Sequence, residues 1–233
     1  MTLLLIAALL MQAPTSPAGR VQNKTMEMEG VGTITYGISV PNDYRPGEPR
    51  PLILALHPGG GGTAFYGSQF MRSIVLGPLG DLRAIVVAPD CSARAWGDPK
   101  CEQAVMALLR KVQEEYTIDR RRVLVTGFSM GGRGTWFMAS HHPDLFTAAI
   151  PMAASTGDEP VERLGKMPTY VIHSRDDERV PFEPAEKNAR ELEKLGRTIR
   201  FEELQGIGHF AMGGYTDALR RAGRWIQERW EKK

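Results

Sequence analysis

The strongest indication of how this chain folds is the segment TGFSMGG at residues 126–132. It lies between a short apolar run at 122–126, which predicts a β-strand, and a helix-forming segment at 133–141. A Gly-x-Ser-x-Gly motif in that context predicts a sharp, strained turn, a nucleophile elbow, that exposes the serine at the end of a strand. Ser129 is therefore the candidate nucleophile. Since the motif arises by chance in roughly one chain of this size in ten, its meaning depends on what the rest of the chain supplies.

Strand-like and helix-like segments alternate along the whole chain. Two segments of alternating polarity come first and predict an antiparallel pair, at 25–29 and 33–41. Continuous apolar runs, typical of strands buried on both faces, follow at 52–56, 84–88, 123–126, 148–152, 169–173 and 198–204. Helix-forming segments accompany them at 101–116, 133–141, 184–195 and 216–230. This order predicts an α/β fold with a mostly parallel sheet and helices on both faces.

Length and composition favour a single domain, at 19–233, with a large core. The chain has 233 residues, 42% of them hydrophobic, and a formal net charge of +2 with both signs interspersed. Nothing in the charge pattern favours a nucleic acid partner, because the densest basic run, 120–122, is best explained as a solvated turn before a strand. The sequence gives no indication of oligomeric state. The apolar helix stripes predict burial of Leu108, Val112, Trp136, Leu219 and Trp225.

The start of the chain has features of a secretion signal. The first eleven residues are nearly all apolar, and the segment at 13–19 is rich in proline and small residues. The apolar run is too short for a transmembrane helix. We therefore expect a signal leader at 1–18, cut near residues 16–18, and a secreted or periplasmic protein. Because no Lys or Arg precedes the run, a disordered or misassigned start of a cytoplasmic protein is the alternative.

The chain has two cysteines, Cys91 and Cys101, which flank a loop that contains the turn-forming segment 97–99. In an exported protein a disulfide between them would close this loop and contribute about 2–3 kcal/mol of stability. In a cytosolic protein they would be two free thiols. Two cysteines without nearby histidines do not make a structural zinc site. We expect neither a metal nor a cofactor.

A nucleophilic serine needs a base that takes its proton as it attacks. After a nucleophile elbow, an acid and then a histidine follow in loops after later strands. His209 fits the position of the base, because it lies among glycines between the last predicted strand and the last helix. His173 ends a buried strand and is more simply structural. His141 and His142 lie at the far end of the helix that follows the elbow, too remote to reach the serine.

The acid is expected in the loop SRDDERVP at 174–181, which follows a predicted strand. Asp176 and Asp177 are both placed to accept the Nδ1 proton of His209, which would fix its tautomer and stabilise the imidazolium. Asp158, which follows an earlier strand, is the third alternative.

A tetrahedral oxyanion needs two backbone N–H donors. Met130, at the start of the helix after the elbow, is expected to supply one. The segment HPGGGG at 57–62 follows a predicted strand and is expected to supply the other. Because Pro58 has no N–H, Gly59 is the first choice and Gly60 the second. A phosphate-binding loop is disfavoured, because no G-K-[ST] or G-x-G-x-x-G pattern with a downstream acid accompanies these glycines.

With these residues assembled, the chain resembles the α/β-hydrolase superfamily. Within it, the chain is similar to serine esterases related to polyhydroxybutyrate depolymerases, feruloyl esterases and the dienelactone hydrolase and prolyl oligopeptidase-like group. The resemblance extends from about Tyr36 to Trp230. It implies an eight-stranded sheet, ester hydrolysis without a cofactor, and an acyl-enzyme on Ser129. Its most specific parts are VPNDY at 40–44, LHPGGG at 56–61, IDRRRV at 118–123 and TGFSMGG at 126–132.

The same resemblance refines the site. The Asp-x-x-Val-Pro arrangement resembles that of these hydrolases and implies Asp177 as the acid, with Asp176 as a solvated or capping neighbour. The chain departs from the group in having Pro58 where a glycine is usual, which bears on the second oxyanion donor. Dienelactone hydrolases proper have a cysteine where this chain has Ser129. The segment 152–168, where related enzymes insert a lid, is short, so we expect no large cap.

Two aromatic residues are candidates for the substrate pocket: Trp96, in the loop after the strand at 84–88, and Phe210, beside His209. The sequence therefore predicts a serine esterase that acts on a small-molecule or polymer-linked ester. A small peptidase of the prolyl oligopeptidase type would use the same machinery and is the first alternative. A catalytically silent binding protein with this fold is the second.

Overall fold

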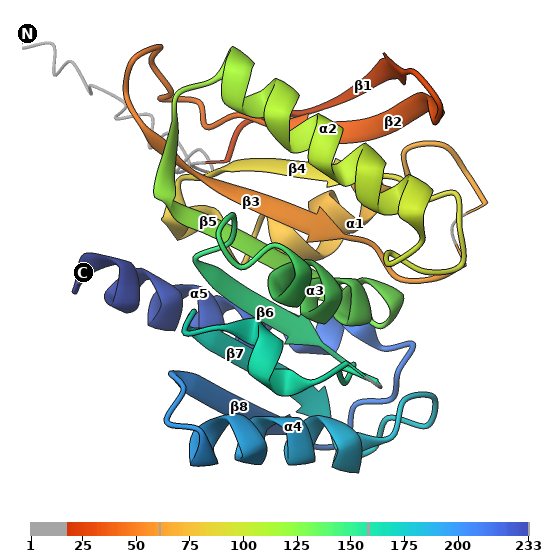
Figure 1. Cartoon of the computed structure of the whole chain (residues 1–233), viewed down its shortest axis with the longest axis vertical. Coiled ribbons are helices and arrows are strands. Elements are labelled where there is room, and N and C mark those ends of the chain that lie inside the picture. The colour runs from red at the N-terminus through yellow and green to blue at the C-terminus, as the bar shows by residue number, and fades with distance from the viewer. Residues whose placement is uncertain (1–17, 61, 158, 233) are drawn as a thin grey trace, which may run out of the picture.

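The computed structural model describes residues 18–60, 62–157 and 159–232 (Figure 1). Residues 1–17 of the predicted leader lie outside these ranges, so the leader stays a prediction.

One sheet of eight strands crosses the described molecule in the order β1-β2-β4-β3-β5-β6-β7-β8. The pairs β1–β2 and β2–β4 are antiparallel, and the other neighbours are parallel. The predicted mostly parallel sheet is confirmed, although β1 starts earlier and β5 is longer than predicted. The strands are β1 Val21–Met28, β2 Gly32–Ser39, β3 Arg50–Leu56, β4 Ile85–Pro89, β5 Ile118–Phe128, β6 Ala148–Met152, β7 Thr169–Ser174 and β8 Ile199–Leu204.

Helices cover both faces of the sheet (Figure 1). In the view of Figure 1, α2, α3 and α4 lie in front of the strands, and α1 and α5 lie behind them. The four predicted helices are all present, with ends shifted by a few residues. The helices are α1 Tyr66–Phe70, α2 Pro99–Glu115, α3 Met130–His141, α4 Phe182–Lys194 and α5 Thr216–Glu231. Shorter helical turns are η1 Met71–Val75, η2 Gly80–Leu82, η3 Val161–Leu164 and η4 Met212–Tyr215.

The sequence did not predict α1, and the reason is tertiary. This five-residue helix has its first N–H groups bonded to a carboxylate beyond β4: the Asp90 side chain accepts from the backbone N–H of Phe65 and of Gly67. A Cβ at Gly67 would lie 2.6 Å from the Ala88 carbonyl oxygen. Contacts with residues far along the chain, which no local pattern reveals, therefore hold α1 in place.

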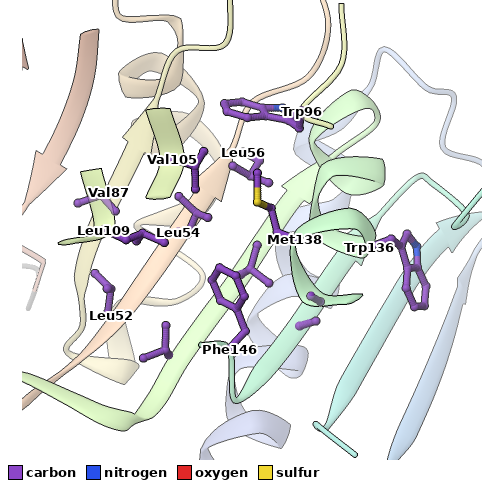
Figure 2. Packing of buried hydrophobic residues seen from close by; sticks show 14 of the residues in the cluster. Leu52, Leu54, Leu56, Val87, Trp96, Val105, Leu109, Trp136, Met138 and Phe146 are labelled. Atoms are coloured by element: carbon purple, nitrogen blue, oxygen red, sulfur yellow. The ribbon is translucent and has the colours of Figure 1, made fainter. Parts of the chain in front are cut away.

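Alternate residues of the central strands fill two hydrophobic cores, one on each face of the sheet. On β3, Leu52, Leu54 and Leu56 point to the face covered by α2 and α3, where they pack in the cluster of Figure 2. Ile53 and Ala55 point to the other face, covered by α1 and α5. All five predicted core residues are buried: Leu108, Val112, Trp136, Leu219 and Trp225.

The prediction of a turn at 120–122 was wrong. These arginines belong to β5, whose first residue, Ile118, pairs with Arg50 before the register shifts. Asp119 shapes this irregular start, because its carboxylate accepts bonds from the Arg121 backbone N–H at 3.0 Å and from the Arg122 side chain at 2.8 Å. The Arg121 side chain is 90% exposed, so the arginine run is solvated as expected, but on a strand.

A disulfide joins Cys91, just after β4, to Cys101 in the first turn of α2, with their Cα atoms 5.4 Å apart. The helix begins next to it, where the Asp98 side chain accepts a bond from the Lys100 backbone N–H and Pro99 occupies the first turn. Residues 91–101, which we call the disulfide loop, are therefore closed at both ends.

The stretch that connects β6 to β7 has one short helical turn, η3, in its described part. The predicted absence of a large cap fits this structure. Among the described residues, no helix is both long and apolar enough to cross a bilayer.

Burial shifts the pKa of two of the three buried histidines of the described chain, His57 and His173. His173, at the end of β7, is fully buried, and its Nε2 donates to the Val180 carbonyl oxygen at 3.1 Å. Its Nδ1 is buried without a hydrogen-bond partner among the described residues. Burial lowers the pKa of His173 from its usual 6.5, and burial does the same to the pKa of His57. Both imidazoles are thus held neutral where an unfolded chain would begin to protonate them.

We predict that Gly131→Ala destabilises the protein by about 3 kcal/mol or more. A Cβ at this position would lie 1.8 Å from the Leu56 carbonyl oxygen, so α3 would have to move off β3. Gly77→Ala is the matched control, since Gly77 is exposed and a Cβ there has open space. Urea unfolding measures both variants. Equal unfolding free energies for the two would contradict the close approach of α3 to β3.

We also predict that stability falls as the pH is lowered from 7.5 to 5. Since the folded pKa of His173 is lowered, the unfolded state binds its proton first, and stability is lost from about pH 6.5 downward. A single histidine contributes a slope of at most about 1.4 kcal/mol per pH unit. His173→Gln keeps a donor for Val180 but does not titrate, so it should flatten the slope. Urea midpoints at four pH values measure this, and an unchanged slope in the variant would rule His173 out as a source.

Candidate active site

Ser129 lies at the junction of β5 and α3, in the backbone conformation that an elbow requires. Its φ is 55° and its ψ is −115°, a region that residues with a side chain rarely adopt. Its backbone N–H donates to the Met152 carbonyl oxygen on β6 at 3.0 Å. The elbow is tight on both sides, because a Cβ at Gly127 would lie 2.3 Å from the Gly131 carbonyl oxygen. The glycines of the motif are therefore required by contact, and the strained serine is held between β3 and β6.

The structure brings together the three side chains predicted far apart in the sequence. His209 Nε2 lies 2.9 Å from Ser129 Oγ. On the other side of the ring, His209 Nδ1 lies 2.8 Å from Asp177 Oδ2. Because ionised Asp177 is acceptor-only, Nδ1 carries the proton and Nε2 is free to accept one from the serine hydroxyl. The three groups form one continuous chain of hydrogen bonds.

Asp177 is held rigidly for this contact. Its side chain is fully buried, and its second oxygen, Oδ1, accepts from the backbone N–H groups of Arg179 at 2.9 Å and Val180 at 2.8 Å. His173 Nε2 lies 3.7 Å from Oδ2, and the Val180 carbonyl to which it donates belongs to the same turn. The two backbone N–H groups on Oδ1 and the His209 Nδ1–H on Oδ2 therefore fix the carboxylate, which suits an ionised group that orients a histidine.

The neighbours of Asp177 bind the backbone of the histidine loop, residues 206–209. Asp176, the alternative acid, accepts from the Gly206 N–H at 2.6 Å and makes no bond to the imidazole. Glu178 accepts from the His209 backbone N–H at 2.9 Å, and this bond is the main reason that the pKa of Glu178 is lowered. Asp158, the third alternative, lies outside the described residues. Three successive carboxylates thus hold one loop against the other.

The two predicted oxyanion donors lie on adjacent segments. Met130 is the first residue of α3, and Gly59 follows β3. A Cβ added at Gly59 would lie 3.8 Å from Met130 Cβ, so the two segments pass close to one another beside Ser129. Gly60 has a φ of 92°, which favours glycine. The assignment of the donors stays a prediction.

Ser129 and His209 open into a surface cleft of about 490 Å³. Phe210, one of the two predicted pocket residues, lines this cleft and is 80% exposed. Trp96, the other, is not among the lining residues. It is 1% exposed, because its indole is turned into the core, where Nε1 donates to the His57 carbonyl oxygen at 3.1 Å. The full lining is Pro58, Gly59, Gly60, Tyr66, Phe128, Ser129, Arg179, Val180, His209, Phe210 and Met212.

Several of these lining residues were not predicted from the sequence. Tyr66 belongs to α1, which was not predicted, and Met212 belongs to the short turn η4. Arg179 lies two residues after Asp177 in the same loop, residues 174–181, which we call the acid loop, and this position was a usable signal. Within the described residues, no group of three or more His, Cys, Asp or Glu side chains is placed to hold a metal ion.

The chain matches the family model described as "Dienelactone hydrolase family" over residues 88–218. It is 26% identical over 195 residues to a probable feruloyl esterase C of Aspergillus niger, an alignment that covers 78% of this chain and 70% of that protein. It is also 26% identical over 181 residues to the corresponding proteins of Aspergillus flavus and Aspergillus oryzae, with 65% of each covered. This chain therefore spans about two thirds of the length of these curated relatives.

Solved structures of esterases also superpose on this chain. A thermostable esterase superposes with a TM-score of 0.78 at 29% identity, covering 89% of this chain and 62% of that one. A feruloyl esterase module from Clostridium thermocellum, complexed with sinapinate, superposes with a TM-score of 0.67 and covers 89% of both chains. At 18% identity, this second match shows the fold alone. With more than half of its residues matched by the family model, the chain belongs to the dienelactone hydrolase family, and its fold is that of the α/β-hydrolase esterases.

Proposed function

We propose that the protein is a serine esterase that hydrolyses carboxylic esters through an acyl-enzyme on Ser129. The observation that carries this proposal is the unbroken hydrogen-bonded chain from Ser129 through His209 to Asp177, of which Ser129 and His209 line an open cleft. The family membership and the esterase relatives support the reaction class.

Acylation begins when Ser129 Oγ attacks the carbonyl carbon of a bound ester. His209 Nε2 is 2.9 Å from the hydroxyl oxygen and takes its proton as the new C–O bond forms. The imidazolium that results is stabilised by Asp177, 2.8 Å from Nδ1, which keeps its negative charge throughout. His209 then gives the proton to the leaving alcohol, and the acyl group remains on Ser129.

The tetrahedral intermediate places a negative charge on the former carbonyl oxygen. We assign its stabilisation to the backbone N–H groups of Met130 and Gly59. Met130 lies in the first turn of α3, where backbone N–H groups have no intrahelical partner and the helix dipole favours an anion. Gly59 passes close to the Met130 side chain, since a Cβ added at Gly59 would lie 3.8 Å from Met130 Cβ.

Deacylation repeats the same steps with water in place of the alcohol. His209, neutral again after the alcohol has left, takes a proton from water as the water attacks the acyl carbon. Collapse of the second tetrahedral intermediate returns the proton to Ser129 Oγ and releases the carboxylic acid. These reaction steps require neither a metal nor a cofactor.

The open cleft suits esters with one bulky part outside the site. Within the described parts of the chain no large cap covers it, and three aromatic side chains line it, those of Tyr66, Phe128 and Phe210. Feruloyl esters appear in the names of the Aspergillus relatives. Such aromatic acyl esters are therefore the first substrates to test, beside short acyl esters.

No observation favours the peptidase, and the intact hydrogen-bonded chain argues against the silent binding protein. We also infer an oxidising compartment, since the Cys91–Cys101 disulfide requires one.

We expect Ser129→Ala to lower kcat for p-nitrophenyl butyrate by about 10⁶, because the variant has no hydroxyl to acylate. A fluorophosphonate probe should label the wild type on the peptide that contains Ser129 and leave the variant unlabelled. Labelling of the variant at another serine would show that the nucleophile has been misassigned.

Two neighbouring aspartates provide a matched test of the acid. We expect Asp177→Asn to lower kcat by about 10⁴, because the amide favours the wrong tautomer of His209. Asp176→Asn retains an oxygen acceptor for the Gly206 N–H and should change kcat by less than about fivefold. The two variants make the same chemical change at adjacent positions. Equal losses in both would contradict the assignment of Asp177.

A further inference from the structure

The disulfide loop, residues 91–101, lies between the two segments that carry the proposed oxyanion donors. On one side it contacts the segment after β3, which contains Gly59. On the other side it contacts α3, which begins at Met130. In Figure 2 the Trp96 side chain lies at the same end of the core cluster as Leu56, the last residue of β3.

His57 is the point of attachment on the β3 side. Its ring is buried, with 2% of the residue exposed. Nε2 accepts from the Cys91 backbone N–H at 3.0 Å, so Nδ1 carries the proton and donates to the Pro58 carbonyl oxygen at 2.7 Å. The His57 carbonyl oxygen accepts from Trp96 Nε1 at 3.1 Å. Two residues of the disulfide loop therefore hold both the ring and the backbone of His57, two residues before Gly59.

Trp96 is also the point of attachment on the α3 side. A Cβ at Gly134 would lie 2.6 Å from Trp96 Cβ, so the tryptophan packs directly against the backbone of the helix. The next loop residue, Gly97, packs against the Phe137 ring, 3.1 Å from where its Cβ would be. The His57 and Trp96 rings meet edge to face at 4.9 Å. The Trp96 side chain thus fixes the distance between the segment after β3 and α3.

We propose that Trp96 is a positioning residue for the oxyanion hole and that the Cys91–Cys101 disulfide holds it in place. This inference rests on the proposed function, because it assigns a role to Trp96 in that reaction. Trp96 does not touch substrate, since it is buried outside the cleft. It acts by holding the Gly59 segment at a set distance from Met130.

The expected effect follows from what an oxyanion hole does. Its donors are worth most when they sit at hydrogen-bond distance from the charged oxygen of the transition state, and removal of one costs 10²–10³ in kcat in a well-studied hydrolase. A shift of about 1 Å in a positioned group costs up to about 10²-fold. Loosening the Gly59 segment should therefore lower kcat with little change in KM, because the ground-state ester does not depend on these bonds.

The first experiment compares two buried tryptophans. Trp96→Phe keeps an aromatic ring in the core but removes the N–H that holds His57. Trp136→Phe is the matched control, since Trp136 is equally buried and donates to the Ala154 carbonyl oxygen. We expect Trp96→Phe to lower kcat about 10-fold, and to weaken a trifluoromethyl ketone inhibitor by the same factor. KM should stay within about twofold, and Trp136→Phe should leave all three values near those of the wild type.

The second experiment removes the Cys91–Cys101 disulfide. Cys91→Ala combined with Cys101→Ala keeps the Cys91 backbone N–H but frees the disulfide loop, so kcat should fall about three- to tenfold. Adding Trp96→Phe to this variant should cost less than it does in the wild type, because both changes act through the same contact with His57. Full additivity would show that the disulfide and Trp96 act separately and would overturn their linkage.

Hydrogen exchange separates a failure of this inference from a failure of the proposed function. We expect faster amide exchange at residues 57–60 in Trp96→Phe than in Trp136→Phe. If the wild type hydrolyses no ester, the proposed function fails. Faster exchange at residues 57–60 in Trp96→Phe would still show that Trp96 holds this segment in place. If the wild type is active and Trp96→Phe matches Trp136→Phe in both kcat and exchange, the positioning role of Trp96 is wrong and the esterase assignment stands.

Discussion

The close approach of α3 to β3 is the constraint on which the rest of this structure depends. The helix packs so tightly on the strand that only a glycine fits at position 131, against the Leu56 carbonyl oxygen. This contact forces the chain to turn at Ser129 with a positive φ, and it places the serine at the end of the central strand, β5. It also places the segment after β3 beside the first turn of α3. The elbow therefore positions the nucleophile and the proposed oxyanion donors together.

The acid loop and the histidine loop, which follow the parallel strands β7 and β8, complete the site at the edge of the sheet where β5 ends. Asp176, Asp177 and Glu178 each bind a different group of the histidine loop. One bond orients the imidazole, and the two others hold the backbone that carries it. These separate contacts explain why the acid loop has three adjacent acidic residues although a single carboxylate contacts the imidazole ring. The imidazole is thus fixed by contacts outside the cleft, which leaves the cleft free for substrate.

Much of this arrangement could be predicted from the sequence, because it is encoded in local motifs and in their order. The elbow, the histidine loop and the alternating strands and helices each have a short signature. The features that were missed depend on contacts between distant residues. The helix α1 is held by Asp90, beyond the next strand. Trp96 lies in a loop near the site, but its packing against Gly134 and its bond to the His57 carbonyl oxygen hold the indole in the core. Side-chain direction of this kind has no signature in the sequence.

The most direct test of the central claim is the proton between His209 and Asp177. If Ser129, His209 and Asp177 form one hydrogen-bonded unit in solution, the Nδ1 proton of His209 is shielded from water and should give a far-downfield resonance in the proton NMR spectrum. We predict that this resonance is present in the wild type, persists in Asp176→Asn and is lost in Asp177→Ala. Its absence from the wild type, or its survival in Asp177→Ala, would contradict the claim.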